Sequence, residues 1–157
     1  MSETYDDPFV FTDPAQLVID NSREAAGQLH HSEIGTEDFL LGLLNDKESA
    51  FAKALFSFEG ATLEAVRARV AFRRGQQYQE PQALLSVPFS QRMARLLQTA
   101  RRLSLKDGRG GEIDIPDVVT AFTDQDGGMG LWALKDVGVR GKALKDRFKK
   151  ELESANA

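Results

Sequence analysis

Residues 34–44 read IGTEDFLLGLL, and this stretch decides the fold. The hydroxyl of Thr36 can accept a hydrogen bond from the otherwise free amides of a first helical turn. Glu37 and Asp38 place negative charge in that turn, where the helix dipole favours it. The phenylalanine and leucines that follow surround the helix on nearly every side. We therefore predict a central, buried helix that is capped by Thr36.

Helical patterns continue on both sides of this stretch. Thr12 precedes an Asp-Pro-Ala sequence, and proline is tolerated in a first turn because its missing N–H had no helical partner. Apolar residues recur at helical spacing within residues 15–29, 50–58 and 63–70. Residues 73–82 are polar, contain glycine and proline and lack this periodicity, so we assign a linker there and bound it at 74–88.

The same order of elements returns after the linker. Three pairs of landmarks share nearly the same offset: Thr12 and Ser90 are 78 residues apart, whereas Ile34 and Ile113, and Leu55 and Leu134, are each 79 apart. A constant offset indicates a duplicated four-helix unit. Because no stretch alternates as a strand does, we predict an all-α fold, an eight-helix bundle of two pseudo-symmetric repeats. The single domain spans 9–153, with the repeats at 9–73 and 89–153.

Composition excludes several classes of protein. The chain has 157 residues, no cysteine and a net charge of −4, which argues against disulfides, thiolate chemistry and general nucleic-acid binding. No apolar run reaches the roughly 18 residues of a membrane span. The acidic first residues do not resemble a secretory signal. We therefore expect a cytoplasmic protein with neither nucleic acid nor membrane as a partner.

Catalytic and metal-binding patterns are missing from the sequence. His30 and His31 are neighbours, so they point in different directions on a helix, and we place both at a solvated helix end. The acidic loops lack the ligand spacing of a calcium loop, and the glycine clusters lack the Lys-Ser/Thr of a phosphate-binding loop. Without a nucleophile and a base, we predict no enzyme, no catalytic residue, no metal and no cofactor.

Two motifs carry a resemblance to a known family. The Phe-Thr-Asp sequence at 11–13 and IGTEDFLLGLL at 34–44 resemble the Clp N-terminal domain, the module at the front of the ClpA, ClpB and ClpC unfoldases that binds substrates and adaptors. The family carries this pattern twice, and the second copy is degenerate here. The resemblance covers residues 9–153. Because no nucleotide-binding motif accompanies it, we expect a free-standing relative of the domain.

The resemblance implies a ligand pocket. In ClpC-type domains the threonine and glutamate that match Thr12 and Glu37 bind phosphorylated arginine. A carboxylate can accept the guanidinium while a hydroxyl and a helix N-terminus receive the phosphate. In the second copy Ser90 can replace the threonine, but Pro116 replaces the glutamate, so we expect one site. The structural alternative is that Thr12 only caps its helix and Glu37 only complements a helix dipole.

The resemblance also implies a peptide-binding patch. In the family, phenylalanines that precede the first helix of each repeat receive peptide ligands, including cyclic peptides, and Phe9 and Phe89 match them. Arg92 and Arg95 would rim the patch, whereas Ala94 replaces a basic residue that the family commonly carries. The alternative is that both rings fold back as hydrophobic staples on their helices.

Two functions remain open at this point. The first is a non-catalytic module of the Clp proteolysis system that binds substrates or adaptors and modulates, or competes with, their delivery to the unfoldase–protease. The second is a structural accessory that docks on the Clp peptidase and stabilises it. Arg95, Arg102 and Lys106 share a face of the predicted fifth helix, which either an acidic partner or solvent can cover. We place Trp132 in the core.

Overall fold

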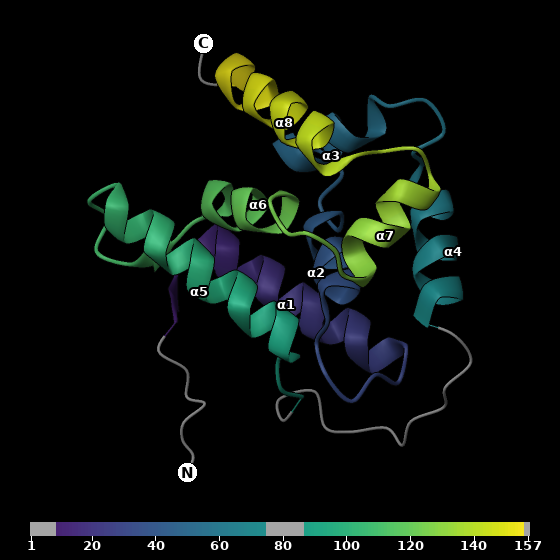
Figure 1. Ribbon diagram of the computed structural model, residues 1–157, viewed down its shortest axis with the longest axis horizontal. Helices are drawn as coiled ribbons and strands as arrows, with labels where there is room; N and C mark the ends of the chain where they lie inside the picture. Colours follow the sequence, from purple (N-terminus) through teal and green to yellow (C-terminus); the bar gives the residue numbers. More distant parts are fainter. Residues whose placement is uncertain (1–8, 75–86, 156–157) are drawn as a thin grey trace.

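The computed structural model describes residues 9–74 and 87–155, and its helices follow the predicted order (Figure 1). The helices are α1 (Asp13–Gln28), α2 (Thr36–Leu43), α3 (Ala50–Phe56), α4 (Leu63–Arg74), α5 (Gln91–Lys106), α6 (Ile115–Thr123), α7 (Met129–Asp136) and α8 (Gly141–Ala155). The all-α prediction is confirmed, with two added strands of two residues each, β1 (Val10–Phe11) and β2 (Glu112–Ile113). Within the described ranges, no helix is both long enough and apolar enough to cross a membrane.

Side-chain caps start the first helix of each repeat at the predicted residues. The amide of Ala15 donates to Thr12 Oγ1 at 3.4 Å, and the amide of Met93 donates to Ser90 Oγ at 3.1 Å. The prediction for α2 was wrong by one residue, because Gly35 is its N-cap and Thr36 lies inside the helix. A glycine cap leaves the threonine hydroxyl available for a contact with another helix.

The two repeats are interleaved. β1 pairs with β2 in parallel, which places Phe11 opposite Ile113. An isolated parallel bridge places Phe89 opposite Ile34 in the same way. The amide of Thr12 donates to the carbonyl of Ile113 at 3.0 Å, and the amide of Ser90 donates to that of Ile34 at 3.0 Å. The start of each repeat is therefore hydrogen-bonded to the loop before the second helix of the other repeat.

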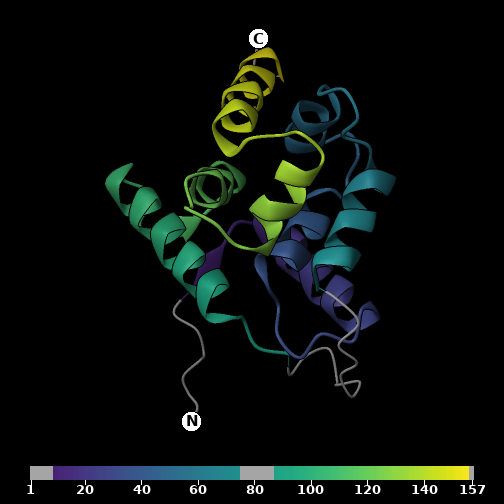
Figure 2. The ribbon, with the colours of Figure 1, turned by 45° about the vertical axis from the view of Figure 1, so that its right-hand side comes forward.

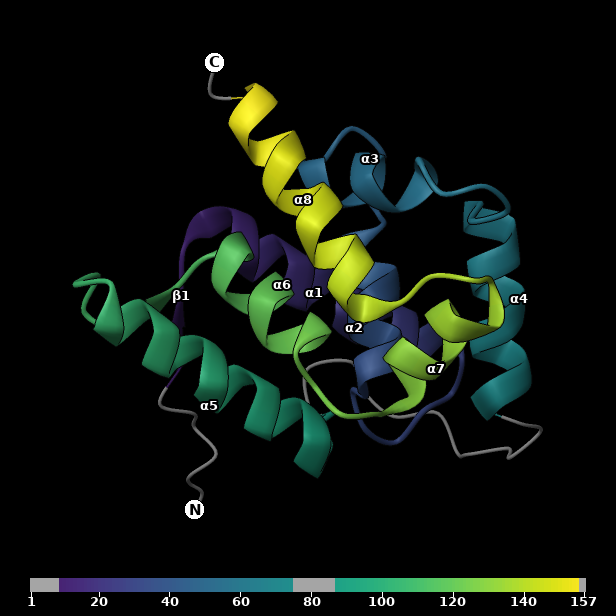
Figure 3. The same cartoon turned by 45° about the horizontal axis from the view of Figure 1, so that its top comes forward.

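One apolar core joins the repeats. The ring centroids of Phe39 and Phe122 lie 6.1 Å apart, and those of Phe51 and Phe148 lie 6.4 Å apart, both edge to face. All four rings are buried, and each contributes about 1.5–3 kcal/mol on burial. α8 packs on α3 (Figure 3). The two halves of the chain therefore stabilise each other.

The predicted linker lies mostly outside the described residues. α4 extends to Arg74, the first residue that we assigned to the linker. At the other end Val87 is buried, and the carbonyl of Pro88 accepts the amide of Ile34 at 2.7 Å. The final two residues of the assigned linker are thus anchored to the first repeat.

Candidate functional site

Three helix N-termini meet at one pocket of about 210 Å³. It is lined by Gly35, Thr36 and Glu37 at the start of α2, by Ser90 and Arg92 at the start of α5, and by Gly128, Met129 and Trp132 of α7. The first-turn amides of a helix have no partner within the helix, and its N-terminal end carries partial positive charge. Together with Arg92, the three termini make the pocket attractive to an anion.

Close packing of α7 on α2 shapes this pocket. The amide of Gly130 donates to Thr36 Oγ1 at 3.0 Å. A Cβ at Gly130 would lie 2.8 Å from the carbonyl oxygen of Thr36, so only glycine permits this approach. The backbone of Gly128 has a φ of 112°, a value that residues other than glycine rarely adopt. Gly128 before α7 and Gly130 in its first turn therefore allow the starts of α7 and α2 to lie close together.

Glu37 supplies a carboxylate to the lining of the pocket. The residue is only 2% exposed, and its carboxylate folds back over Gly35, where a Cβ would collide with Glu37 Oε1. Gly35 thus provides the space that the carboxylate occupies. Across the pocket, Ser90 Oγ accepts the amide of Met93, which leaves the hydroxyl proton available to donate.

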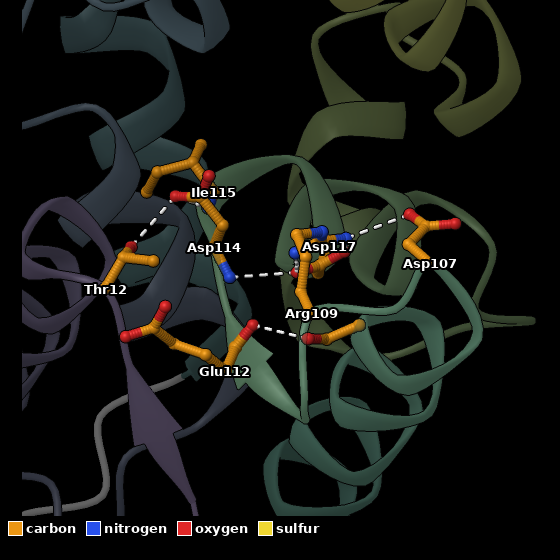
Figure 4. Close-up of polar contacts among 8 residues, drawn as sticks. Thr12, Asp107, Arg109, Glu112, Asp114, Ile115 and Asp117 are labelled. Atoms are coloured by element: carbon orange, nitrogen blue, oxygen red, sulfur yellow. Dashed lines mark hydrogen bonds and ion pairs between the residues drawn. The ribbon is translucent and has the colours of Figure 1, made fainter.

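The pseudo-symmetric position in the other repeat is filled by the protein itself. Thr12 Oγ1 donates to Asp114 Oδ1 at 2.9 Å, as Figure 4 shows. Asp114 stands where the first repeat has Gly35, and Pro116 stands where it has Glu37. The carboxylate of Asp114 thus engages the hydroxyl that a ligand would otherwise contact. The duplication leaves an open pocket at Ser90 and an internal hydrogen bond at Thr12.

The structure places Thr12 and Glu37 in different surroundings. Glu37 lines a pocket with Ser90, whereas Thr12 bonds to Asp114 and to the backbone of Ile113. The reason is the interleaving, because each capping hydroxyl faces the helix start of the other repeat. The binding roles that the sequence assigns to all three residues stay predictions, but only Glu37 and Ser90 line the same pocket, and Thr12 lies outside it.

His31 and Asp38 form a buried pair beside the pocket. His31 Nδ1 lies 2.7 Å from Asp38 Oδ1, and the amide of Gly35 donates to Asp38 Oδ2 at 2.9 Å. The prediction of a solvated helix end is wrong for His31, which is 5% exposed. Ligand-type atoms of His31, Glu37 and Asp38 lie within 4.8 Å of one another, but the histidine nitrogen already contacts its carboxylate. The prediction of no metal stays a prediction.

The second repeat has a similar buried carboxylate, which pairs with an arginine instead of a histidine. Arg109 donates two hydrogen bonds of 2.6 Å to the two oxygens of Asp117, and the amide of Asp114 donates to Asp117 Oδ2 at 2.9 Å. Hydrogen bonds from Arg109 to Asp117, and then to Asp107, raise the pKa of the guanidinium above its ordinary value. Sequence reasoning missed both pairs. The repeat offset was the available signal, since an offset of 79 aligns Asp38 with Asp117 and an offset of 78 aligns His31 with Arg109.

Arg92 and Arg95 come together in a second cavity of about 270 Å³. The cavity is lined by Arg92, Arg95, Leu96 and Thr99 of α5 and by Ala121, Gln125 and Asp126. Arg92 Nη1 donates to the carbonyl of Gly127 at 3.2 Å and lies 3.4 Å from Asp126 Oδ1. Arg92 therefore borders both cavities, on either side of the start of α5.

The predicted aromatic patch is half-buried. Phe89 packs against Ala26, Ile34 and Val87, whereas the ring of Phe9 lies 6.4 Å from that of Phe11. The strand register makes Phe11 the counterpart of Phe89, so Phe9 and Phe89 do not occupy equivalent positions. Their role as a peptide patch stays a prediction.

The core assignment of Trp132 was wrong, since the residue is 45% exposed. It lines the pocket of Ser90 and Glu37. In the sequence, its apolar neighbours Leu131 and Ala133 gave no indication that Trp132 is exposed. The exposure follows from the short α7 helix, which buries its opposite side through Ala133 and Leu134.

Comparisons with known proteins agree on one family. The sequence model of the Clp repeat N-terminal domain matches residues 10–111. The chain is 38% identical over 93 residues to the ATP-dependent Clp protease ATP-binding subunit ClpC of Staphylococcus saprophyticus, and 36% identical over 92 residues to the chaperone protein ClpB of Oceanobacillus iheyensis. Each match covers 59% of this chain and 11% of the relative, so the chain spans a small part of their length.

Solved structures share the fold. The N-terminal domain of the Caseinolytic protease associated chaperone ClpD from Arabidopsis thaliana superposes with a TM-score of 0.71 at 21% identity, covering 90% of this chain and 96% of that one. The N-terminal domain of Hsp104 from Candida albicans gives a TM-score of 0.68 at 16% identity, covering 88% and 89%. At these identities the likeness concerns the fold alone.

Proposed function

Because the chain belongs to the family of Clp repeat N-terminal domains, we propose that it is a non-catalytic binding module of the Clp proteolysis system. It binds substrates or adaptors of a Clp unfoldase–protease and so modulates their delivery. The chemical group that binds in its pocket is phosphorylated arginine. The observation that carries this proposal is the convergence of three helix N-termini on one pocket that also contains the Glu37 carboxylate.

Phosphoarginine presents a phosphoryl group bonded to a guanidinium, so its receptor must offer positive and negative groups side by side. The phosphoryl oxygens face the helix amides, the Ser90 hydroxyl and the Arg92 guanidinium. The guanidinium of the ligand faces the carboxylate of Glu37, whose planar geometry suits paired N–H donors. An unmodified arginine would contact only the Glu37 carboxylate, because it has no phosphoryl group.

The size of the pocket fits a side-chain head group. A volume of about 210 Å³ holds the phosphorylated end of an arginine, while the peptide backbone stays outside. Trp132, exposed at the rim, offers a flat apolar surface to the neighbouring residues of the peptide. The module therefore recognises a marked side chain within many different sequences.

Isothermal titration calorimetry with free phosphoarginine tests the proposal. The wild type should bind one equivalent, and free arginine should bind at least about tenfold more weakly, a difference of about 1.4 kcal/mol. Ser90→Ala and Glu37→Gln should each weaken phosphoarginine binding by about tenfold or more. The matched control is Thr12→Ala, which removes the pseudo-symmetric cap but leaves the pocket intact. Absence of binding, or equal losses in Ser90→Ala and Thr12→Ala, would refute the assignment.

A further inference from the structure

The outer face of α5 is basic along most of its length. Arg95, Arg102 and Lys106 are all exposed, and their spacings of seven and four residues place them on one face, over about 16 Å. The opposite face is buried through Met93, Leu96, Leu97, Ala100 and Ser104. Figure 2 shows the α5 ribbon at the edge of the molecule.

These three cations have no carboxylate partner among the residues that the structure describes. Among residues 9–74 and 87–155, none of the three forms an ion pair, and Arg102 donates only to the hydroxyl of Thr99 at 3.2 Å. Other cations in the same acidic protein are paired: Arg69 with Asp136, Arg109 with Asp117 and Lys145 with Asp124. Like charges aligned on one helix face repel each other, so an acidic partner would relieve a repulsion that the fold leaves uncompensated.

The cavity of Arg92 and Arg95 lies at the N-terminal end of this face. Gln125 also lines this cavity, but its side-chain oxygen Oε1 is shielded from solvent and does not face the opening. Arg95 therefore belongs both to this cavity and to the basic face of α5.

We propose that the basic face of α5 and the adjoining cavity bind a segment of a partner protein that is rich in aspartate and glutamate. Such a segment supplies carboxylates to Arg95, Arg102 and Lys106. Nucleic acid is disfavoured because the whole chain carries a net charge of −4 and the basic surface is confined to one helix. This docking surface is separate from the proposed phosphoarginine function, although Arg92 borders both.

Fluorescence anisotropy with a labelled oligoglutamate peptide tests the proposal. The wild type should bind the peptide, with an affinity that falls as salt concentration rises. Arg95→Glu and Arg102→Glu should each weaken binding by about five- to tenfold. The matched control is Lys149→Glu, which makes the same charge change at an exposed position on α8 and should bind like the wild type.

Three results would overturn this inference. One is absence of binding at low salt, and another is an equal loss in the Lys149→Glu control. The third is tight binding of a single-stranded oligonucleotide of equal charge, if its affinity equals that of the peptide and depends on the same arginines. Phosphoarginine titration of Arg95→Glu separates this inference from the proposed function, because that variant should keep its phosphoarginine affinity. Sedimentation of each variant identifies any effect that arises from self-association.

Discussion

At the scale of single residues, one glycine decides which of two related positions is open. Gly35 leaves space for the Glu37 carboxylate beside Ser90. Asp114 occupies the corresponding place in the second repeat and bonds to Thr12. The difference between the two positions therefore depends on side-chain volume and charge at the residue before each helix.

Gly35→Ala should displace the Glu37 carboxylate, because the new methyl group would collide with it. We expect phosphoarginine affinity to fall by about tenfold while the circular dichroism spectrum stays helical. Asp114→Ala makes a comparable change at the pseudo-symmetric position and should leave the affinity unchanged. Unaltered binding by Gly35→Ala would show that the carboxylate does not contact the ligand.

The anchoring carboxylates provide a stability prediction. Asp117 is buried and accepts hydrogen bonds from Arg109 and from the amide of Asp114. Because Arg109 is partly exposed, Asp117→Ala should lower the free energy of unfolding by about 2 kcal/mol, less than for a fully buried pair. Asp107→Ala removes the exposed partner of the same arginine and should cost at most about 0.5 kcal/mol. Urea denaturation measures both, and equal losses would contradict the ranking.

The pH dependence of this pair follows from the direction of the pKa shift. A raised pKa in the folded state means that Arg109 contributes stability while it is protonated, and that this contribution is lost only as pH rises through the folded-state pKa. The ordinary pKa of arginine is already far above neutral pH, and the pKa in the folded state is higher still. We therefore expect no loss of stability from Arg109 deprotonation between neutral pH and pH of about 11, as followed by urea denaturation.

At the scale of elements, the capping residues connect helices that belong to different repeats. Thr12 caps α1 and also donates to Asp114 at the start of α6. Ser90 caps α5, but the residue that faces it from the other repeat is a glycine. Two caps with the same local role thus make different numbers of hydrogen bonds.

Thr12→Ala should therefore destabilise the protein more than Ser90→Ala. Loss of a helix cap costs about 1 kcal/mol, and Thr12 loses a second hydrogen bond, worth about another 1 kcal/mol. The midpoints of thermal unfolding, measured side by side, check this order. Equal destabilisation of the two variants would indicate that the bond to Asp114 contributes nothing.

Local patterns were sufficient to predict the helices and their order. Apolar spacing and hydroxyl caps act within a few residues, so the starts of α1 and α5 could be located from the sequence. The grouping of Ser90 with Glu37 could not be predicted from the sequence, because it depends on pairing between segments that are far apart in the chain. Burial of His31 was missed for the same reason, since it depends on how the loop before α2 packs.

At the scale of the whole molecule, interleaving makes the two repeats depend on each other. β1 of the first repeat pairs with β2 of the second, and the ring of Phe51 packs on that of Phe148. Separation of the repeats would expose these buried rings and leave the paired backbone groups without partners. A single cooperative unit follows from this arrangement.

Fragments 1–74 and 87–157 should therefore remain largely unfolded when each is purified alone. Mixed in equal amounts, they should associate and recover helical circular dichroism, because the interface is the core itself. A fragment that unfolds cooperatively by itself would contradict this dependence.

The binding account is tested most directly by an NMR titration of the ¹⁵N-labelled protein with phosphoarginine. It predicts that the amide shifts change at the three helix starts around the pocket, in residues 35–37, 90–92 and 128–130, and that those of Thr12 and Asp114 stay in place. Shift changes centred on Thr12 and Asp114, or a spectrum that does not change at saturating ligand, would contradict it.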